Sequence, residues 1–442
     1  MLPIINTATD WPKVEALKAK LSLKPLLIEG LDDETGQSNS FETVRGILRD
    51  VQQRGDAAVI DYTAKFDKHT FASASAMRVP QTVVDAALRA ATPQFLAALD
   101  TAIANLRRYQ SAMMPPEPAP ISIPGTGAKL GVKYTPLQRV GLYVPGGAAA
   151  YPSSVLHTAI PAQVAGVREL CLCSPMRDGT ISPAVLAAAH KLGITEIYAI
   201  GGAQAVAAMA FGTATIRPVD KIVGPGNTYV QLAKKELYGI VDIDSFAGPS
   251  EVIVLADESA SAHQVAAELL AQAEHAPGSC LLITTSKSLA AAVQQELEAQ
   301  LASLTREKIT RKALEFASAI LITPTHEKAL QLVDYFAPEH LQITTADSRG
   351  DAQRIQHAGA IFVGPFTPVA AGDYLAGPSH VLPTSGTARF FSGLSADSFR
   401  KRTSLVEFDQ KALDALGQTI VDFAMVEGFD AHAKSVSFRA KA

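Results

Sequence analysis

The spacing of apolar residues divides the chain into two parts with different periods. From about residue 40 to residue 113, apolar residues recur three and four positions apart, which is typical of amphipathic helices. The proline-rich run at 115–120 ends this helical part, because proline cannot continue a helix. Beyond it, short apolar runs bounded by glycine and proline alternate with alanine-rich helical segments. This alternation predicts parallel sheets covered by helices.

The short apolar runs predict strands in two series. The first series covers residues 139–144, 169–174, 195–200 and 220–224, and the second covers 251–257, 280–285, 319–323 and 360–364. Predicted helices separate the strands, at 153–166, 181–192 and 203–211 and then at 259–275, 287–302, 326–336 and 351–357. The sequence therefore predicts an α/β protein with two doubly wound sheets. The last ~50 residues, with a helix near 410–425, are too few for an independent core and are expected to pack on something else, such as another subunit.

Composition and charge narrow the class of protein. Of the 442 residues, 48% are hydrophobic and 19% are charged, as in ordinary globular proteins. The formal net charge is −4 and basic residues form no patch, so we expect no nucleic-acid partner. Two long uncharged stretches, 140–167 and 197–216, are interrupted by proline or glycine, so we expect no membrane span. Three cysteines without a CxxC pair, and an N-terminus unlike a signal peptide, predict a cytoplasmic location.

The predicted helix at 259–275 ends with two side chains that suit a metal ion. Gln272 and His275 are three positions apart and share one face, and Pro277 and Gly278 close the helix. An amide oxygen and an imidazole nitrogen are acceptable ligands for a divalent ion such as zinc. A solvated helix end is the alternative.

Glu339 and His340 follow Pro338 directly. Adjacent residues diverge on a regular strand, but an irregular corner at a proline lets both enter one pocket. A carboxylate beside an imidazole can relay protons near neutral pH. A surface pair that caps the next segment is the alternative.

The segment 365–386 is rich in glycine and proline, which predicts a loop after a strand, and it carries Asp373 and His380. Ligands bind beyond the carboxyl ends of strands in open α/β sheets. Asp373 is therefore a candidate anionic metal ligand and His380 a candidate substrate contact, although an Asx-turn would also explain the aspartate. Glu427 and His432 stand in the weakly anchored tail, where a histidine is usually solvated.

Glycine-rich turns follow the predicted strands of the first series, at 143–154, 200–213 and 223–230. Neither GxGxxG nor GxxxxGK[ST] is present, so the usual dinucleotide and P-loop fingerprints are missing. Exposed N–H groups at helix starts can nevertheless hold a pyrophosphate. Tight turns without a ligand are the alternative.

Taken together, these segments resemble the histidinol dehydrogenase family. The motifs YVPGG, GGAQA, VDKIVGPGN, AGPSE, AQAEH, APEHL, AGDY, HVLPT and VEGFDAH occur in the family's order and span roughly residues 40–435. Each motif is short, but their fixed order across most of the chain is specific. The resemblance implies two Rossmann-like domains without the glycine fingerprint and a homodimer with shared active sites. The implied boundaries are an N-terminal segment at 1–38, a first domain at 39–142 and 250–394, an inserted NAD-binding domain at 143–249 and a C-terminal tail at 395–442.

The resemblance also implies an activity, namely zinc-dependent, NAD-linked oxidation of L-histidinol to L-histidine through L-histidinal. These are the last steps of histidine biosynthesis, and two NAD are consumed per product. Zinc ligands carry over to Gln272, His275, Asp373 and His432, the last from the other subunit. Glu339 would activate water for the aldehyde step, and His340 would take the alcohol proton.

Substrate and cofactor contacts carry over in the same way. The implied substrate contacts are Ser250, Gln272, His275, His340, Asp373, His380, Glu427 and His432, and the implied NAD contacts are Tyr143, Gln204 and Asn227. The chain has GPSH at 377–380 where members commonly have GTNH. Pro378 and Ser379 could reshape the substrate loop, so substrate identity is the least secure transfer.

Three other functions are compatible with parts of this pattern. A relative could use the same zinc and NAD machinery on another polar alcohol, although Glu427 would repel an anionic head group. A metal-dependent hydrolase would also use zinc, glutamate and histidine, but it has no use for the glycine turns. A catalytically dead binding protein is disfavoured because no matched ligand or base position is lost.

Overall fold

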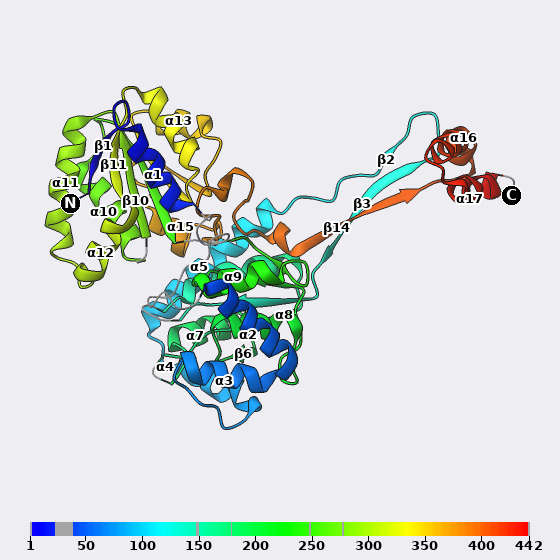
Figure 1. Ribbon diagram of the computed structural model, residues 1–442, viewed down its shortest axis with the longest axis horizontal. Coiled ribbons are helices and arrows are strands. Elements are labelled where there is room, and N and C mark those ends of the chain that lie inside the picture. The colour runs from blue at the N-terminus through cyan, green and yellow to red at the C-terminus, as the bar shows by residue number, and fades with distance from the viewer. Residues whose placement is uncertain are drawn as a thin grey trace.

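The computed structural model describes residues 2–22, 39–146, 150–177, 179–246, 249–275 and 278–440. It has two stacked lobes, each built on a parallel sheet, and a long arm that carries the C-terminus away from both (Figure 1). The predicted α/β class is confirmed. Within these described ranges, no helix is both long enough and apolar enough to cross a membrane.

The six-stranded sheet forms the core of the upper lobe in Figure 1. Its spatial order is β1 (Ile4–Asn6), β11 (Ala319–Ile322), β10 (Gly278–Thr284), β9 (Ser250–Ala256), β12 (His340–Thr344) and β13 (Ala360–Val363), all parallel. Successive side chains of a strand point to opposite faces. In β9, Val252 and Val254 accordingly join one apolar cluster while Ile253 and Leu255 join another.

Helices cover both faces of this sheet. The cluster with Val252 includes apolar residues of α10 (Ala262–Ala273), α11 (Lys287–Leu301) and α12 (Glu307–Ala317). The cluster with Ile253 includes residues of α1 (Trp11–Leu21), α13 (His326–Phe336) and the end of α14 (Ser348–Arg354). Strands buried on both faces read as continuous apolar runs, which is why the sequence revealed β9, β10 and β11. The sequence also revealed β13, an edge strand that is only partly buried but whose residues are all apolar. It did not reveal β1 or β12.

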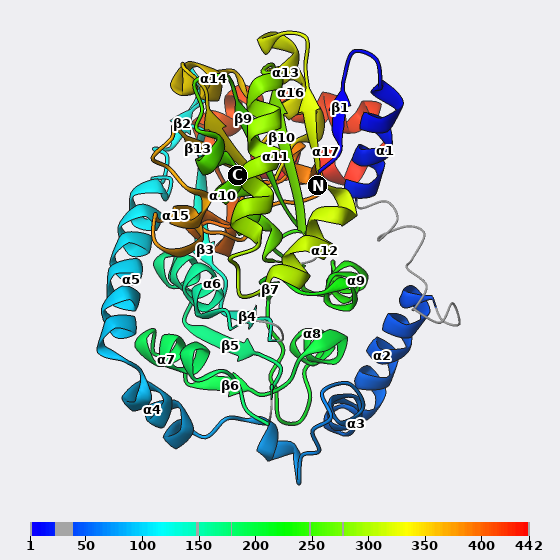
Figure 2. The same ribbon diagram turned by 90° about the vertical axis from the view of Figure 1, so that its left-hand side faces the viewer.

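The five-stranded sheet forms the core of the other lobe. Its order is β6 (Glu196–Tyr198), β5 (Glu169–Cys173), β4 (Arg139–Tyr143), β7 (Lys221–Val223) and β8 (Asp242–Ile243), again all parallel. Next to the sheet, α6 (Pro152–Ala165) and α7 (Pro183–Lys191) lie on one face, and α8 (Gly202–Phe211) and α9 (Thr228–Leu237) lie on the other (Figure 2). Numbered along the chain within each sheet, β4–β8 and β9–β13 both follow the order 3-2-1-4-5.

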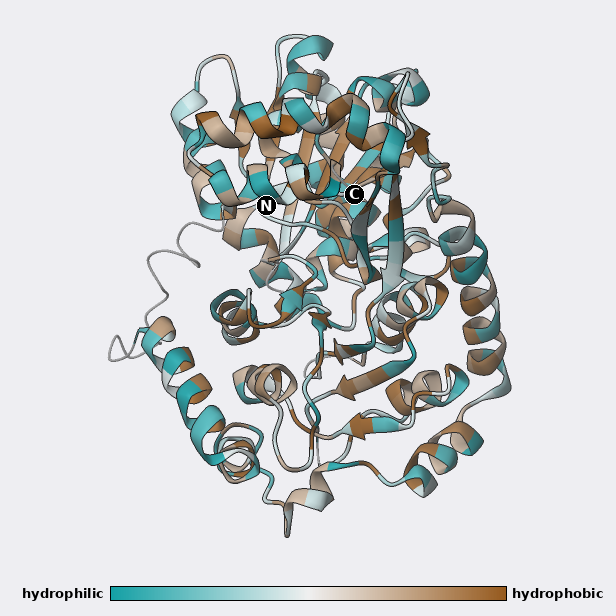
Figure 3. Cartoon of the chain, turned by 90° about the vertical axis from the view of Figure 1, so that its right-hand side faces the viewer, coloured by the Kyte–Doolittle hydropathy of each residue, from teal (hydrophilic) through white to brown (hydrophobic). Residues whose placement is uncertain are grey.

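The helices of the N-terminal third pack outside this second lobe, which corrects the expected domain boundary. They are α2 (Ser40–Arg54), α3 (Asp56–Phe66), α4 (Gln81–Ala90) and α5 (Pro93–Met113). Their buried side chains, such as Val44 and Leu106, belong to the same core as β4 and α8. The helices at 40–113 therefore pack mainly with 143–249, although Gln110 in α5 also donates to the Gly377 carbonyl. The physical reason is that these helices have one apolar face each, and that face finds its partner on α6–α9 (Figure 3).

The arm was not predicted as such. It consists of β2 (Ile121–Ser122), β3 (Lys129–Pro136) and β14 (Arg400–Glu407), paired in antiparallel fashion, with α16 (Gln410–Val426) and α17 (Asp430–Ala440) at the far end (Figure 1). Only the helix near 410–425 was foreseen. Phe423, Val426 and Phe438 on these helices are 68%, 89% and 73% exposed. Side chains of this kind are usually covered in the functional assembly.

Candidate active site

Chemistry-bearing side chains gather at the amino edge of the six-stranded sheet. Ser250 opens β9 and His340 opens β12, and the two strands are adjacent and parallel. The end of α10 leads into this edge just before β10. The expectation that the 365–386 segment acts beyond a strand's carboxyl end is therefore wrong, because Asp373 reaches back to His340 at the opposite edge.

The last turns of α10 supply the first group of side chains. Glu268 and Gln272 are one turn apart, and His275 follows just beyond the helix, so the three share a face. Gln272 is buried, and its Nε2 has no hydrogen-bond partner within the described chain. His275 is exposed overall, yet partial loss of solvent lowers its pKa, an effect that Asp373 opposes and His340 reinforces. Pro277, expected to end this helix, lies outside the described residues.

The short helix α15 (Val369–Tyr374) lies against this face of α10 and brings Asp373 to it. The backbone N–H of Val369 donates to the Glu268 carboxylate at 3.0 Å, which holds the start of α15 on α10. Asp373 lies one turn later, with an Oδ1 oxygen 3.6 Å from His340 Nε2. Burial alone would raise the pKa of Asp373, but His340, His380 and His275 together lower it, so the carboxylate is ionised.

Glu339 and His340 form a buried pair, as the corner at Pro338 predicts. Glu339 Oε2 lies 3.5 Å from His340 Nδ1, and both residues are 5% exposed. Burial raises the pKa of Glu339 to about 7, although His340 opposes the shift. Burial would lower the pKa of His340, but Glu339 and Asp373 outweigh it and raise that pKa to about 9. The arrangement places a carboxyl with a near-neutral pKa beside an imidazole, which suits proton transfer.

Glu251 holds Glu339 and His340 in place through its backbone, and the sequence analysis did not single it out. Its backbone N–H donates to Glu339 Oε2 at 2.9 Å, and its carbonyl accepts from His340 Nδ1 at 3.2 Å. A carbonyl only accepts, so His340 carries its proton on Nδ1 and, when neutral, leaves Nε2 as the basic atom. Burial raises the pKa of the Glu251 side chain to about 8, with Glu339 adding to the shift. Its position beside Ser250 in the motif AGPSE was the one available signal.

His380 approaches the same cluster from the segment after α15. Its Nδ1 lies 3.1 Å from the carbonyl of Asp373, and its Nε2 lies 3.2 Å from Ser154 Oγ on α6. Burial lowers the pKa of His380 to about 4, so the ring is neutral near pH 7. The charges of His380, Asp373, His340 and His275 act on one another, which shows that the structure brings these four predicted residues together.

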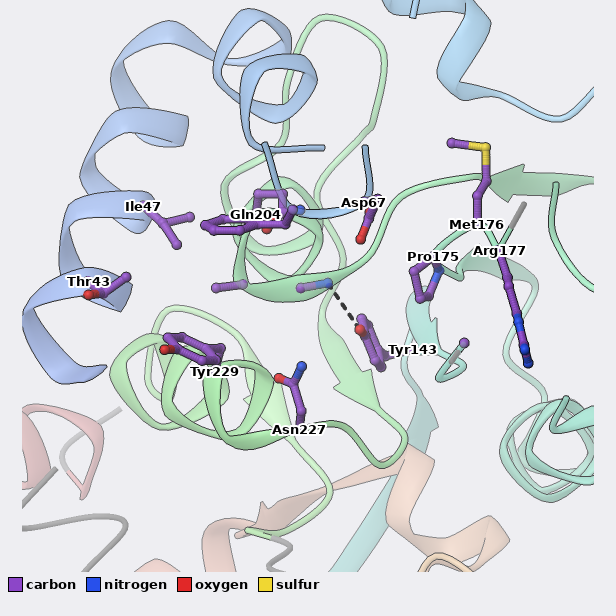
Figure 4. A pocket seen from close by; sticks show the side chains of 14 residues that line it. Thr43, Ile47, Asp67, Tyr143, Pro175, Met176, Arg177, Gln204, Asn227 and Tyr229 are labelled. Carbon is purple, nitrogen blue, oxygen red and sulfur yellow. Dashed lines mark hydrogen bonds between the residues drawn. The ribbon is translucent and has the colours of Figure 1, made fainter. Parts of the chain in front are cut away.

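A separate cavity of about 750 Å³ lies at the carboxyl end of the five-stranded sheet (Figure 4). Tyr143 ends β4, Gln204 lies in the first turn of α8, and Asn227 caps α9 by accepting from the Val230 N–H at 3.1 Å. The three predicted cofactor residues therefore line one cavity. The Tyr143 hydroxyl accepts from the Gly202 N–H at 3.0 Å. Residues 147–149 of the first glycine turn lie outside the described chain.

Two features of this cavity suit a dinucleotide. Both amide atoms of Gln204 are buried without a hydrogen-bond partner in the described structure, so they are available to a ligand. The cavity also receives the starts of α8 and α9, and the N-terminal end of a helix favours anionic phosphates, although the Gly202 and Val230 N–H groups already donate within the chain. Sequence reasoning missed Asp67 after α3, whose carboxyl lines the cavity, and Thr43 and Ile47 of α2. No motif distinguished these residues, because α2 and α3 reach the cavity only through tertiary packing.

Comparison with known proteins identifies the family. A family model described as histidinol dehydrogenase matches residues 32–440. The chain is 50% identical over 401 residues to a histidinol dehydrogenase of Rhodopirellula baltica, covering 90% of this chain and 86% of that one. It is 47% identical over 435 residues to that of Geobacillus kaustophilus, covering 97% and 99%. A crystal structure of the Elizabethkingia anophelis histidinol dehydrogenase superposes with a TM-score of 0.90 at 33% identity, covering 100% of this chain and 98% of that one.

The chain belongs to the histidinol dehydrogenase family. As a member it is an oxidoreductase of histidine biosynthesis.

The zinc ligands implied by this family are only partly assembled in the single chain. Across the described residues, no group of three or more His, Cys, Asp and Glu side chains is arranged to hold a metal ion. Of the implied ligands that gather at the amino edge of the six-stranded sheet, only His275 and Asp373 belong to these four residue types, because Gln272 is an amide. The residues present still fit a metal, since a neutral imidazole, an ionised carboxylate and a buried amide without a partner face the same region.

Glu427 and His432 are the predicted site residues that the single chain does not bring to the cluster. Glu427 follows α16 and His432 lies in α17, and both are exposed at the far end of the arm (Figure 1). The arm points away from both lobes, so these side chains cannot reach the cluster of their own chain. In a histidinol dehydrogenase dimer they would have to serve the site of the other subunit.

Proposed function

We propose that the chain catalyses the zinc-dependent, NAD-linked oxidation of L-histidinol to L-histidine through L-histidinal. Overall, one alcohol, one water and two NAD would yield one carboxylate and two NADH, with release of three protons. The observation that carries this proposal is the pair of sites: a buried Glu339–His340–Asp373 cluster and a distinct dinucleotide-sized cavity. Two oxidations need both a base and a hydride acceptor.

Zinc would be held by Gln272, His275 and Asp373 of one chain and by His432 of the other. Bound zinc would orient the amino and imidazole nitrogens of the substrate and fix the alcohol carbon in place. The residues favour such a site, because buried Gln272 supplies an amide oxygen and the Asp373 carboxylate is ionised.

His340 would take the proton of the alcohol once it has given up the proton that Glu339 and Asp373 hold on it near pH 7, and Glu339 would activate the water that adds to the aldehyde. The Glu251 carbonyl fixes the His340 tautomer, which aims the basic Nε2 toward Asp373 and the ligand cluster. The pKa of Glu339, raised to about 7 by burial, lets it act as a base without being permanently charged. Its Oε2 is anchored by the Glu251 N–H, so the carboxyl is held in one orientation.

NAD would occupy the cavity of the five-stranded sheet, with Tyr143, Gln204 and Asn227 as contacts. The helix starts there favour the pyrophosphate, and the amide of Gln204 is free to bind it or a ribose. We also propose that the enzyme is a homodimer in the cytoplasm. The exposed apolar side chains of α16 and α17 support the dimer, because they need a partner surface.

The yield of NADH per mole of L-histidinol tests the reaction. A yield of two, with histidine as product, supports the four-electron route. A yield of one would indicate a simple alcohol dehydrogenase. No NADH at all would favour another substrate, such as a different polar alcohol, or another class, such as a hydrolase.

Mixing two inactive variants tests the shared site. Chains with His432→Ala and chains with Glu339→Gln should each form almost no histidine alone. If the arm crosses, a mixed dimer contains one site with both native residues and should recover part of the activity. Absence of recovery, once mixed dimers are verified by mass, would contradict the crossing.

A further inference from the structure

His157 stacks on His380 in the interior of the protein. It lies in the middle of α6 and is 0% exposed. The two ring centroids are 4.2 Å apart, and the planes differ by 9°. Nearly parallel rings at this distance share a face from which water is excluded, so His157 restricts how the His380 ring can tilt.

Hydrogen bonds from a backbone N–H and from a hydroxyl hold the His380 loop against His157. The His380 N–H donates to His157 Nδ1 at 3.0 Å, and the Ser379 hydroxyl donates to the His157 carbonyl at 2.9 Å. The Val381 N–H donates in turn to Ser379 Oγ at 3.2 Å. Pro378 and Ser379, where the sequence departs from the family pattern, thus lie in the part of the loop that packs on α6.

These contacts fix both tautomers. A backbone N–H can only donate, so His157 Nδ1 accepts and the His157 proton is on Nε2. A carbonyl can only accept, so His380 carries its proton on Nδ1, which faces the Asp373 carbonyl. His380 Nε2 is then an acceptor, and Ser154, one turn before His157 on α6, lies 3.2 Å from it.

Stability does not explain an imidazole at position 157. Its Nε2 is buried and has no hydrogen-bond partner among the residues described, and an unsatisfied buried donor destabilises the folded state. An apolar side chain of similar size would avoid that penalty. What histidine supplies and an apolar side chain cannot is the Nδ1 acceptor combined with a flat face.

We propose that His157 is a positioning residue that holds His380 in one plane and one tautomer, so that His380 Nε2, which accepts from the Ser154 hydroxyl in the free chain, exchanges that donor for an N–H group of the substrate. The inference rests on the proposed function for the identity of that substrate, L-histidinol, which carries imidazole and ammonium N–H donors. A lone pair aimed at the substrate repels a carboxylate, sulfonate or phosphate head group. Because α6 starts after the glycine turn of the cofactor cavity, the same contact also ties the substrate loop to the cofactor lobe.

Substitutions at position 157 separate the two contributions. His157→Leu removes the acceptor and the flat face, His157→Phe keeps the face, and His157→Asn keeps an acceptor. On the zinc-loaded dimer, calorimetric titration with L-histidinol should give about ten-fold weaker binding for the Leu variant and partial rescue in the other two. KM for L-histidinol should rise more than kcat falls, and the Kd of NAD should not change. His190→Phe, at the end of the neighbouring α7, is the matched control.

Nitrogen NMR of ¹⁵N-histidine-labelled protein gives a second readout that needs no substrate. His380 should show a protonated Nδ1 and an unprotonated Nε2 in the native protein and a tautomer mixture in His157→Leu, with a His380→Asn variant assigning the signals. A folded Leu variant with native binding and a native nitrogen pattern would overturn the proposal. If the Leu variant does not fold, the Phe and Asn variants test the proposal in its place. The proposal would also be overturned if both of these variants kept native binding of L-histidinol and the native His380 tautomer. Native protein that shows the expected tautomer but does not bind L-histidinol would refute the proposed function and leave the positioning role standing.

Discussion

The two parallel sheets share a strand order but use opposite edges and different chemistry. The five-stranded sheet presents its carboxyl end, where Tyr143, Gln204 and Asn227 surround a cavity lined largely by uncharged groups and helix starts. The six-stranded sheet presents its amino edge, where Glu339 and His340 are buried among other titratable side chains. In the proposed function, the first site would hold a large ligand through hydrogen bonds, and the second would move protons.

The contrast shows that strand order alone does not place a site. The carboxyl end of a doubly wound sheet offers helix starts and glycine turns without further help. The amino edge offers neither, so its ligands come from elements added around the sheet, namely α10, α15 and the segment at 378–381. In the proposed function, the last residues of the set, Glu427 and His432, would come from a second chain. We therefore expect a site built from so many separate elements to be sensitive to a change in any one of them.

Removal of zinc should produce the largest difference between the two sites. We expect a chelator to abolish turnover, because the substrate would lose the group that orients its nitrogens, while the Kd of NAD stays unchanged because its cavity belongs to the other sheet. Turnover should return on addition of zinc and not of magnesium, which prefers oxygen ligands. A fully metal-free protein that keeps its rate would contradict the assignment of Gln272, His275 and Asp373.

The structure brings together most of the residues that the sequence proposed for the two sites, but the sequence did not predict what surrounds them. Apolar runs located β9, β10, β11 and β13, but β12 was read as a corner because Pro338 precedes it. The pocket lining from α2 and α3 left no local signal, since amphipathic helices show which face is buried and not what covers it. For the same reason, the sequence analysis grouped the helices of residues 39–142 with the wrong sheet. Glu251 was missed because it acts through its backbone, which any residue type can supply.

Glu339→Gln should have the next largest effect, and it should fall on the six-stranded site alone. Without a carboxylate to activate water, we expect histidine formation to slow by about 10²–10⁴-fold, while the first hydride transfer continues. The yield of NADH per L-histidinol should then fall from two toward one, with KM for NAD unchanged. Glu315→Gln, an exposed position on α12, controls for the substitution itself. Unchanged histidine formation would remove Glu339 from the mechanism.

Gly202→Ala tests the five-stranded site and should show the opposite kinetic signature. Gly202 has φ +66°, and a Cβ there would lie 2.6 Å from Gln204 Oε1, so the Gln204 amide must move. We expect KM for NAD to rise about ten-fold, as for the loss of one or two hydrogen bonds, with little change in KM for L-histidinol. Gly193→Ala has a similar φ of +70° with nothing within 4 Å, so it reports backbone strain alone. Equal effects of the two variants on NAD would exclude a role for Gln204.

The smallest expected effect concerns the buried acid behind the catalytic pair and appears in stability. The pKa of Glu251 is about 8 in the folded chain against an ordinary value of 4.5, so between these values the folded state keeps a proton that the unfolded state has released. Stability must then fall as pH rises through this window, by about 1.4 kcal/mol per pH unit for one proton. Glu251→Gln should remove that share of the slope between roughly pH 6 and 7, which lies below the pKa of about 8 to which burial lowers that of Lys18. Glu339 and His340, with pKa values raised to about 7 and about 9, contribute slopes of the same sign that are present in both proteins. Urea titrations across this range, with exposed Glu15→Gln on α1 as the control, measure the difference. Equal slopes in the native protein and the Glu251→Gln variant would mean that Glu251 is ionised at neutral pH, and that the edge of the six-stranded sheet carries one more negative charge than its burial implies.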